Sequence, residues 1–209
     1  MDIIQRNAIK SWTLLEPRPE IIIVGRENGT EEIVAELGLE HVPEVARNEY
    51  GTPLINDIFE KAQNAATGEI ICYVNADIIL FQDFLDAVKT VAAAMRSFLM
   101  IGQRWDMDID ETIDFSGGWD DKLREAVETG GTLHPPTGLD YFASARGLWN
   151  DLPPFAIGRT VWDNYLIYHA RATGAHVVNA TEAVGIVHQN HDYSHIRNDI
   201  SQTQVWKGP

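Results

Sequence analysis

The sequence has a single cysteine, Cys72, among its 209 residues, so no internal disulfide can form. A chain without disulfides favours a reducing compartment, and we expect a cytoplasmic protein. Its longest apolar runs are much shorter than the roughly 20 residues that a membrane-spanning helix needs. No basic segment followed by an apolar one stands at the N-terminus, so no signal peptide is predicted.

Basic residues are also scarce. The chain carries 16 Lys and Arg against 31 Asp and Glu, which gives a formal net charge of -15 at pH 7. Such a charge repels phosphate backbones and anionic headgroups, which argues against a nucleic-acid or membrane partner. The same charge is compatible with a site that recruits divalent cations, and equally with a role in solubility alone.

Three common nucleotide-binding and catalytic motifs are missing. The chain contains no Gly-x-Gly-x-x-Gly, no Gly-x-x-x-x-Gly-Lys-Ser/Thr and no Gly-x-Ser-x-Gly. Dinucleotide-binding, P-loop and α/β-hydrolase interpretations therefore lose their main support.

Helix and strand patterns alternate along the first half of the chain. Segments with apolar residues at helical spacing are separated by short β-branched runs that Gly or Pro bounds. The expected helices are 3–14, 30–37, 54–66 and 84–95, and the expected strands are 20–24, 41–45, 70–74 and 98–101. This alternation predicts a doubly wound α/β fold with a mostly parallel sheet, in one domain over 1–209.

The second half is less regular. We expect helices over 119–129 and 160–173, and strands near 140–143, 176–178 and 184–187. The acidic segment 106–118 begins like an EF-hand loop. However, Glu111 stands where the sharp turn needs Gly, and Gly117 stands where the bidentate Glu belongs. We therefore expect a solvated loop there.

The strand at 70–74 is the starting point for predicting function. Its residues are apolar on both faces, which predicts a parallel strand covered by helices on both sides. Ligands in open α/β sheets gather at the carboxyl ends of the strands, and Asn75-Ala76-Asp77 follows this strand. In an extended segment the side chains of Asn75 and Asp77 point the same way, toward one cation or a ribose. The alternative is an ordinary turn, in which Asp is common.

Two further groups of polar residues stand out in the second half. Three of the seven histidines, at 188, 191 and 195, follow the strand expected at 184–187. Imidazole suits Mn and Zn, whereas a solvated loop is the alternative for any single histidine. Asp163 lies in the first turn of the expected helix 160–173. The helix N-terminus is a sufficient structural reason for an acid there, and the apolar approach to it favours a general base instead.

These features together resemble the GT-A-type glycosyltransferases, closest to the family 2-like group. The resemblance rests on Ala-Ala-Thr-Gly-Glu-Ile-Ile-Cys-Tyr-Val-Asn-Ala-Asp at 65–77, a later Trp-Asp-Asn and a late His, and it spans roughly 20–195. It implies a three-layer fold and a Mn or Mg cation held by Asp77, with His188 completing the metal shell and His191 as its rival. It also implies that Asp163 is the catalytic base. Asn75 replaces the first Asp of the family's Asp-x-Asp motif, and an amide oxygen ligates a cation or holds a ribose more weakly.

The resemblance also implies a missing segment. Members usually begin with an apolar strand and a polar loop that cradle the nucleobase, whereas this chain opens at the helix that follows them. We therefore expect a sequence shortened at both ends. Base binding then falls to the remaining loops, which carry Asn28 and Asn56. Gln103, Arg104 and Asp140 are candidates for the walls of the donor or acceptor site.

The predicted function follows from this resemblance. We expect a metal-dependent, inverting transferase that moves a sugar from a nucleotide-diphosphate donor to a hydroxyl-bearing acceptor, which is a glycan, a lipid or a protein. The first alternative is a binding module that kept the fold and lost catalysis, which Asn75 and the missing strand favour. The second is a sugar-phosphate nucleotidyltransferase, a class that opens with a Gly-rich loop absent here. We also expect Asp77 and His188 to meet at the carboxyl ends of strands in one sheet.

Overall fold

The computed structural model describes residues 3–159 and 161–191. Its helices are α1 (Ile3–Trp12), α2 (Thr30–Leu37), α3 (Ile55–Ala65), α4 (Gln82–Ala94), α5 (Trp119–Gly130) and α6 (Trp162–Ala172). Each of them was expected from the sequence, within a few residues at its ends. Gly38 ends α2 as predicted, because its left-handed backbone (φ 62) lets its N–H donate to Val34 O. None of the described helices is both long and apolar enough to cross a bilayer.

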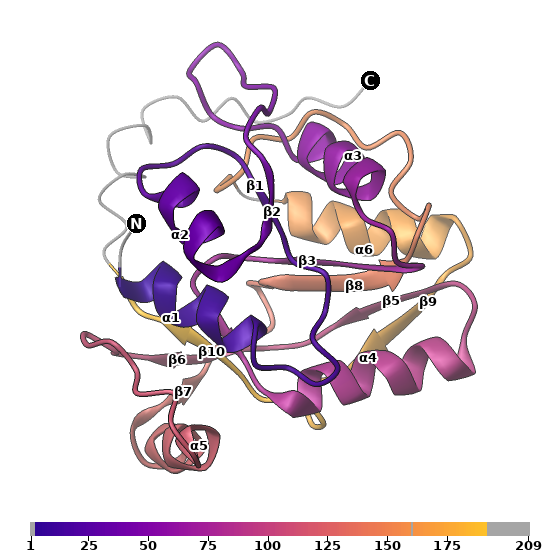
Figure 1. The fold of residues 1–209 in the computed structure, drawn as a ribbon. Coiled ribbons are helices and arrows are strands. Elements are labelled where there is room, and N and C mark those ends of the chain that lie inside the picture. The colour runs from indigo at the N-terminus through magenta and orange to yellow at the C-terminus, as the bar shows by residue number, and fades with distance from the viewer. Residues whose placement is uncertain (1–2, 160, 192–209) are drawn as a thin grey trace.

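The strands form three small sheets, which Figure 1 shows in one view. One sheet pairs β1 (Ile22–Val24) with β2 (Glu40–Val42). The second has the order β3 (Ile70–Val74), β8 (Tyr141–Ala145), β5 (Phe98–Ile101) and β9 (His176–Asn179). The third has the order β4 (Ile78–Leu80), β10 (Ile186–Gln189), β6 (Trp105–Met107) and β7 (Thr132–Leu133).

The sheets are mixed in direction. β1–β2, β5–β9 and β6–β10 are parallel pairs, whereas β3 and β5 both run antiparallel to β8, and β4–β10 and β6–β7 are antiparallel. The expectation that the strand at 70–74 has a parallel neighbour is therefore wrong, because its partner in the described chain is the antiparallel β8. Its apolar residues still lie between two helical layers, which was the physical basis of that expectation.

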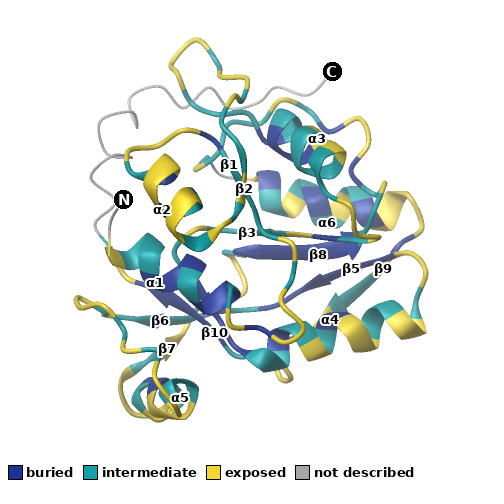
Figure 2. Cartoon of the chain, in the orientation of Figure 1, coloured by how far each residue is buried: buried dark blue, intermediate teal, exposed yellow. Residues whose placement is uncertain are grey.

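Side chains of the four-stranded sheet alternate between two apolar clusters. Phe98, Met100 and Tyr141 pack with residues of α1 and α4, whereas Leu99 and Phe142 pack with residues of α3 and α6. Figure 1 shows α4 on one side of this sheet and α3 and α6 on the other, and Figure 2 shows that the two central strands, β8 and β5, are buried. Alternation of this kind is what a strand between two layers requires. The three-layer α/β fold expected from the sequence is confirmed.

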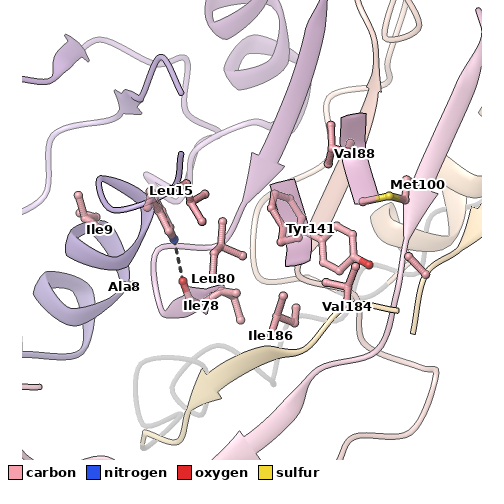
Figure 3. Close-up of a cluster of buried hydrophobic side chains, with 14 of the residues drawn as sticks. Ala8, Ile9, Leu15, Ile78, Leu80, Val88, Met100, Tyr141, Val184 and Ile186 are labelled. Atoms are coloured by element: carbon pink, nitrogen blue, oxygen red, sulfur yellow. Dashed lines mark hydrogen bonds between the residues drawn. The ribbon is translucent and has the colours of Figure 1, made fainter. Parts of the chain in front are cut away.

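Helix α1 fixes the position of β4. Ala8, Ile9 and Leu15 lie in the same apolar cluster as Ile78 and Leu80 (Figure 3). Two hydrogen bonds add to this packing. The indole N–H of Trp12 donates to Ile78 O at 2.8 Å, and the Leu80 N–H donates to the hydroxyl of Ser11 at 3.1 Å. Because β4 begins one residue after Asp77, the contact between α1 and β4 also holds that carboxylate in place.

β1 and β3 do not pair with each other. Among the described strands, β1 pairs with β2 alone and β3 pairs with β8 alone. Residues of both strands, together with Gly25 and Asn75 at their carboxyl ends, line one cavity. The two strands therefore border a cleft instead of forming one continuous sheet.

Candidate metal and nucleotide site

The cleft has a volume of about 1470 Å³. Small-molecule pockets typically span roughly 300–1,000 Å³, so this one has room for an extended ligand. Its lining includes charged, amide and imidazole side chains: Glu27, Asn75, Asp77, Arg104, Asp140, Arg159, Asp163, Asn164, His188 and His191. The structure thus brings most of the predicted site residues to one cleft.

Asp77, His188 and His191 form a group of possible metal ligands on this cleft. One ligand atom from each lies within 4.8 Å of the other two. Asp77 Oδ2 is 3.1 Å from His191 Nε2 and 3.5 Å from His188 Nε2. The sequence makes His191 a rival of His188 for the cation, and the structure places both rings beside Asp77. The third histidine of the predicted cluster, at 195, lies outside the described residues.

Asp77 and His188 meet because of a strand pairing that the sequence did not predict. β4 runs antiparallel to β10, and His188 is paired in register with Ile78, the residue after Asp77. Gln189 strengthens the junction, since its main-chain N–H and its side-chain amide both donate to Asp77 O, at 3.3 and 3.1 Å. The predicted approach is confirmed, but the expected reason is wrong, because His188 lies within β10 and not beyond the end of a parallel strand.

The electrostatics of Asp77 suit a cation. Burial alone would raise its pKa, but contacts with the imidazoles of His188 and His191, and the positive charge these rings carry when protonated, hold that pKa below the ordinary 3.8. Asp77 is therefore ionised at neutral pH. Its Oδ1 is buried without a hydrogen-bond partner among the described residues. A buried oxygen left unpaired costs free energy, so the carboxylate has an unused ligand atom that a cation would satisfy.

The amide of Asn75 is already engaged by the protein. Asn75 Oδ1 accepts a hydrogen bond from the Tyr73 hydroxyl at 2.8 Å, and Nδ2 donates to Asp140 Oδ1 at 2.7 Å. The Asn75 main-chain N–H also donates to Asp140 O at 2.9 Å. The antiparallel β3–β8 pairing places Asp140 beside Asn75 and makes these contacts possible. Asn75 thus joins the loop after β3 to the start of β8.

Asp140 belongs to a buried chain of charged groups. Its Oδ2 accepts a hydrogen bond from Arg104 Nη1, and both side chains are at most 10% exposed. Arg104 Nε donates to Asp106 Oδ1 at 2.8 Å, and Asp106 Oδ2 lies 2.6 Å from His134 Nδ1. The same Asp106 Oδ1 is 3.2 Å from His188 Nδ1. Arg104 and Asp140 therefore connect the loop after β3 with the strand that carries His188.

Sequence reasoning missed Asp106 and His134. Asp106 fell in the segment 106–118 that was expected to be a solvated loop, whereas it is in the middle of β6, which pairs with β10 and β7. His134 follows β7, and its main-chain N–H donates to Arg104 O at 2.9 Å. The only local signal was the apolar–polar–apolar order of Trp105, Asp106 and Met107, which is typical of a short strand.

Solved structures similar to this chain share its fold. A mannosyltransferase from Pyrobaculum calidifontis, in complex with GDP-Man and Mn2+, matches with a TM-score of 0.59 and 15% identity, over 95% of this chain and 56% of that one. Glucosyl-3-phosphoglycerate synthase from Mycobacterium tuberculosis matches with a TM-score of 0.54 and 18% identity, over 93% of this chain and 71% of that one. The chain has a GT-A fold.

These likenesses are structural. No protein-family model and no curated protein matches the chain. The chain spans only 56% of the length of the mannosyltransferase. At identities of 15% and 18%, the GT-A fold is what the comparisons show, and the roles of individual residues rest on the geometry of this chain.

Asp163 lies on the cleft of this GT-A fold, in the first turn of α6. Its Oδ1 accepts a hydrogen bond from the main-chain N–H of Asn164 at 2.8 Å. Val161, which precedes the helix, has a φ of 82, a left-handed conformation that β-branched residues rarely adopt. Asp163 and the group of Asp77, His188 and His191 therefore border the same cleft from different elements.

The structure does not bring Asn28 and Asn56 to this GT-A cleft. Asn28 is an exposed residue of the loop after β1 and is absent from the cleft lining, although Gly25 and Glu27 of that loop belong to it. Asn56, in α3, lines a different cavity together with Arg146. Gln103 is also outside the cleft lining, and its side-chain amide donates to a main-chain oxygen at 2.6 Å. The expected base-binding role of Asn28 and Asn56 therefore lacks support from their positions.

Proposed function

We propose that this chain is a divalent-cation-dependent glycosyltransferase that moves a sugar from a nucleotide-diphosphate donor to a hydroxyl group. The observation that carries the proposal is the group of Asp77, His188 and His191 on the cleft of a GT-A fold. Two similar structures contain such ligands: the mannosyltransferase holds GDP-Man and Mn2+, and one structure of the synthase holds Mn2+, UDP-glucose and phosphoglyceric acid. The cleft has room for both a donor and an acceptor.

The donor atoms fit the proposed cation. Asp77 offers a buried Oδ1 without a partner among the described residues, and the Nε2 atoms of His188 and His191 lie 3.5 and 3.1 Å from its other oxygen, Oδ2. Carboxylate oxygen suits Mg and Mn alike, whereas imidazole favours Mn over Mg. A cation bound there would neutralise negative charge that develops on the leaving diphosphate. A cation held by Asp77, His188 and His191 would have three protein ligands. Its remaining coordination positions would be open to diphosphate oxygens and water.

Asp163 is the proposed general base. Its Oδ2 would accept the proton of the acceptor hydroxyl while that hydroxyl oxygen bonds to the anomeric carbon. The bond between this carbon and the diphosphate oxygen breaks at the same time, and the nucleoside diphosphate leaves with its electron pair. A single displacement of this kind inverts the anomeric carbon. The hydrogen bond from the Asn164 N–H to Oδ1 supports the role, because it orients the carboxylate.

The remaining predicted residues hold the site in shape. Asn75, Arg104 and Asp140 line the cleft, but their side chains bond to one another or to neighbouring protein groups. We therefore assign them to the support of the donor site, with Arg104 as a positive charge on the cleft. A cytoplasmic location and a single domain over 1–209 remain predictions from the sequence.

A donor panel tests the proposed function. The protein is incubated with Mn and each of several nucleotide sugars, including GDP-mannose and UDP-glucose, and released nucleoside diphosphate is measured with and without hydroxyl acceptors. We expect release with at least one donor, and its loss with EDTA or in Asp77→Ala. Calorimetry runs in parallel. A nucleotide that binds without any turnover would replace this proposal with a binding module, and pyrophosphate release from a nucleoside triphosphate would replace it with a nucleotidyltransferase.

A further inference from the structure

Asp106 and His188 face each other across two neighbouring strands. β6 and β10 are parallel, and their register pairs Asp106 with His188. Asp106 Oδ1 lies 3.2 Å from His188 Nδ1. On the opposite edge of the same ring, His188 Nε2 lies 3.5 Å from Asp77 Oδ2. The imidazole is thus placed between the carboxylate of the cation site and a second carboxylate behind it.

His188 Nδ1 needs this second carboxylate. The ring is 2% exposed, and Nδ1 has no aligned hydrogen bond among the described residues. A buried N–H without a partner is unfavourable, and Asp106 Oδ1 is already within hydrogen-bonding distance. A small rotation of the ring therefore completes the bond, and it does so with Nε2 directed at the cleft.

Asp106 is itself held on both oxygens. Arg104 Nε donates to Oδ1 at 2.8 Å, and His134 Nδ1 contacts Oδ2 at 2.6 Å. Arg104 is held in turn by Asp140. A carboxylate held by two such groups cannot turn away from His188 without breaking these contacts. Its orientation toward the imidazole ring is therefore fixed.

We propose that Asp106 is a positioning residue for the cation site. Its carboxylate accepts a hydrogen bond from the Nδ1–H of His188 and so keeps Nε2 unprotonated and directed at the ion. A histidine ligand needs its free nitrogen lone pair toward the metal, and the hydrogen bond at its other nitrogen fixes both tautomer and orientation. The inference rests on the proposed function only in taking Asp77, His188 and His191 as the ligands. Arg104 and His134 contribute to the same positioning of His188, since they hold Asp106.

Two measurements test the proposal, and neither involves sugar transfer. The first is the tautomer of His188, read from ¹⁵N chemical shifts of the labelled, metal-free protein above the titration range of histidine. The second is the dissociation constant of Mn2+, read by electron paramagnetic resonance with and without UDP. We expect the Nδ1–H tautomer in the wild type. In Asp106→Ala we expect a mixture of tautomers and Mn2+ binding weakened by about 10- to 100-fold.

Asp106→Asn separates positioning from charge. Its side-chain oxygen still accepts from Nδ1–H, so the wild-type tautomer should return while Mn2+ affinity recovers only in part. Asp110→Ala is the matched control, because it removes an exposed carboxylate from the same acidic segment, and it should change neither readout. Circular dichroism checks folding, and Asp106→Leu, which fills more of the space and offers Nδ1–H no acceptor, takes the place of Asp106→Ala if that variant does not fold.

Three results would overturn the proposal. They are an Nε2–H tautomer in the wild type, unchanged Mn2+ affinity in a folded Asp106→Ala, or weakened affinity with an unchanged tautomer in Asp106→Ala, which would leave only a charge effect. A wild type that binds no Mn2+ would defeat the proposed cation site, and the tautomer measurement would still decide whether Asp106 orients His188.

Discussion

Asn75 Nδ2 donates a hydrogen bond of 2.7 Å to Asp140 Oδ1, so the amide that replaces the first carboxylate of an Asp-x-Asp motif faces a buried carboxylate. Asp140 is 4% exposed and also accepts from Arg104. Two carboxylates at such a distance would repel each other, and one of them would be forced to bind a proton. The structure therefore gives a physical reason for an amide at position 75.

Asn75→Asp should accordingly destabilise the protein. The new carboxylate would meet Asp140 instead of donating to it, and Tyr73 would keep its acceptor. We expect a loss of about 1–3 kcal/mol in the free energy of unfolding, which is the cost of a lost buried hydrogen bond with an unpaired group. Urea titration measures it, and Mn2+ affinity should not improve.

The double variant Asn75→Asp with Asp140→Asn restores one carboxylate and one amide with their positions exchanged. It should recover most of the lost stability, because the hydrogen bond can form again in the opposite direction. A single Asn75→Asp variant that keeps its stability and binds Mn2+ more tightly would mean that residue 75 faces the ion instead of Asp140.

Local sequence patterns predicted the helices and the strand before Asp77 because these elements have their own periodicity and end signals. The apolar run 70–74 and the helix ending at Gly38 are examples. Three short strands, β4, β6 and β7, were not predicted, because they owe their conformation to their partners. The equally short β1 was predicted, since it lies within the apolar run at 20–24.

The same limit explains what was predicted of the site. Asp77 and His188 were found from residue type and from their place after apolar runs. Asp106 and His134 were missed, because their contact with His188 and Arg104 depends on the β6–β10 and β6–β7 pairings. Long-range pairing of short strands leaves little trace in local sequence.

Asp77→Ala should abolish the coupling between cation and nucleotide. If Asp77, His188 and His191 hold Mn2+ and diphosphate oxygens also bind the ion, cation and nucleotide would each raise the affinity for the other, typically 5- to 150-fold. Calorimetric titration of UDP or GDP with and without Mn2+ measures this factor, which should fall to about one in the variant. The fold should persist, because Gln189 bonds to the main-chain oxygen of Asp77 and not to its side chain.

Asp121→Ala is the matched control for this change, since it removes an exposed carboxylate from the first turn of α5. It should leave the coupling intact. Undiminished coupling in Asp77→Ala would exclude the proposed metal role of Asp77.

Asp106 should contribute to an acid-sensitive part of the stability. Burial would raise its pKa, but hydrogen bonds from His134 and Arg104 and their charges lower it below 3.8. Because the folded-state pKa is the lower one, the contribution is present above pH 3.8 and is lost as the pH falls through the folded value. The free energy of unfolding, measured by urea titration with EDTA between about pH 2.5 and 6, should fall less steeply with acid in Asp106→Asn. An identical acid limb in the variant and the wild type would contradict the lowered pKa.

Asp163→Asn should remove catalysis and spare binding. The amide keeps the shape and the oxygen that accepts from the Asn164 N–H, but it cannot take a proton from the acceptor hydroxyl. We expect kcat to fall by about 10²- to 10⁴-fold, the usual contribution of a general base, with unchanged dissociation constants for Mn2+ and for the donor. Asp121→Asn is the matched control, because it makes the same substitution at an exposed carboxylate in the first turn of another helix, α5. Full turnover by Asp163→Asn would exclude this residue as the base, whereas a parallel loss of donor binding would assign it to the donor site.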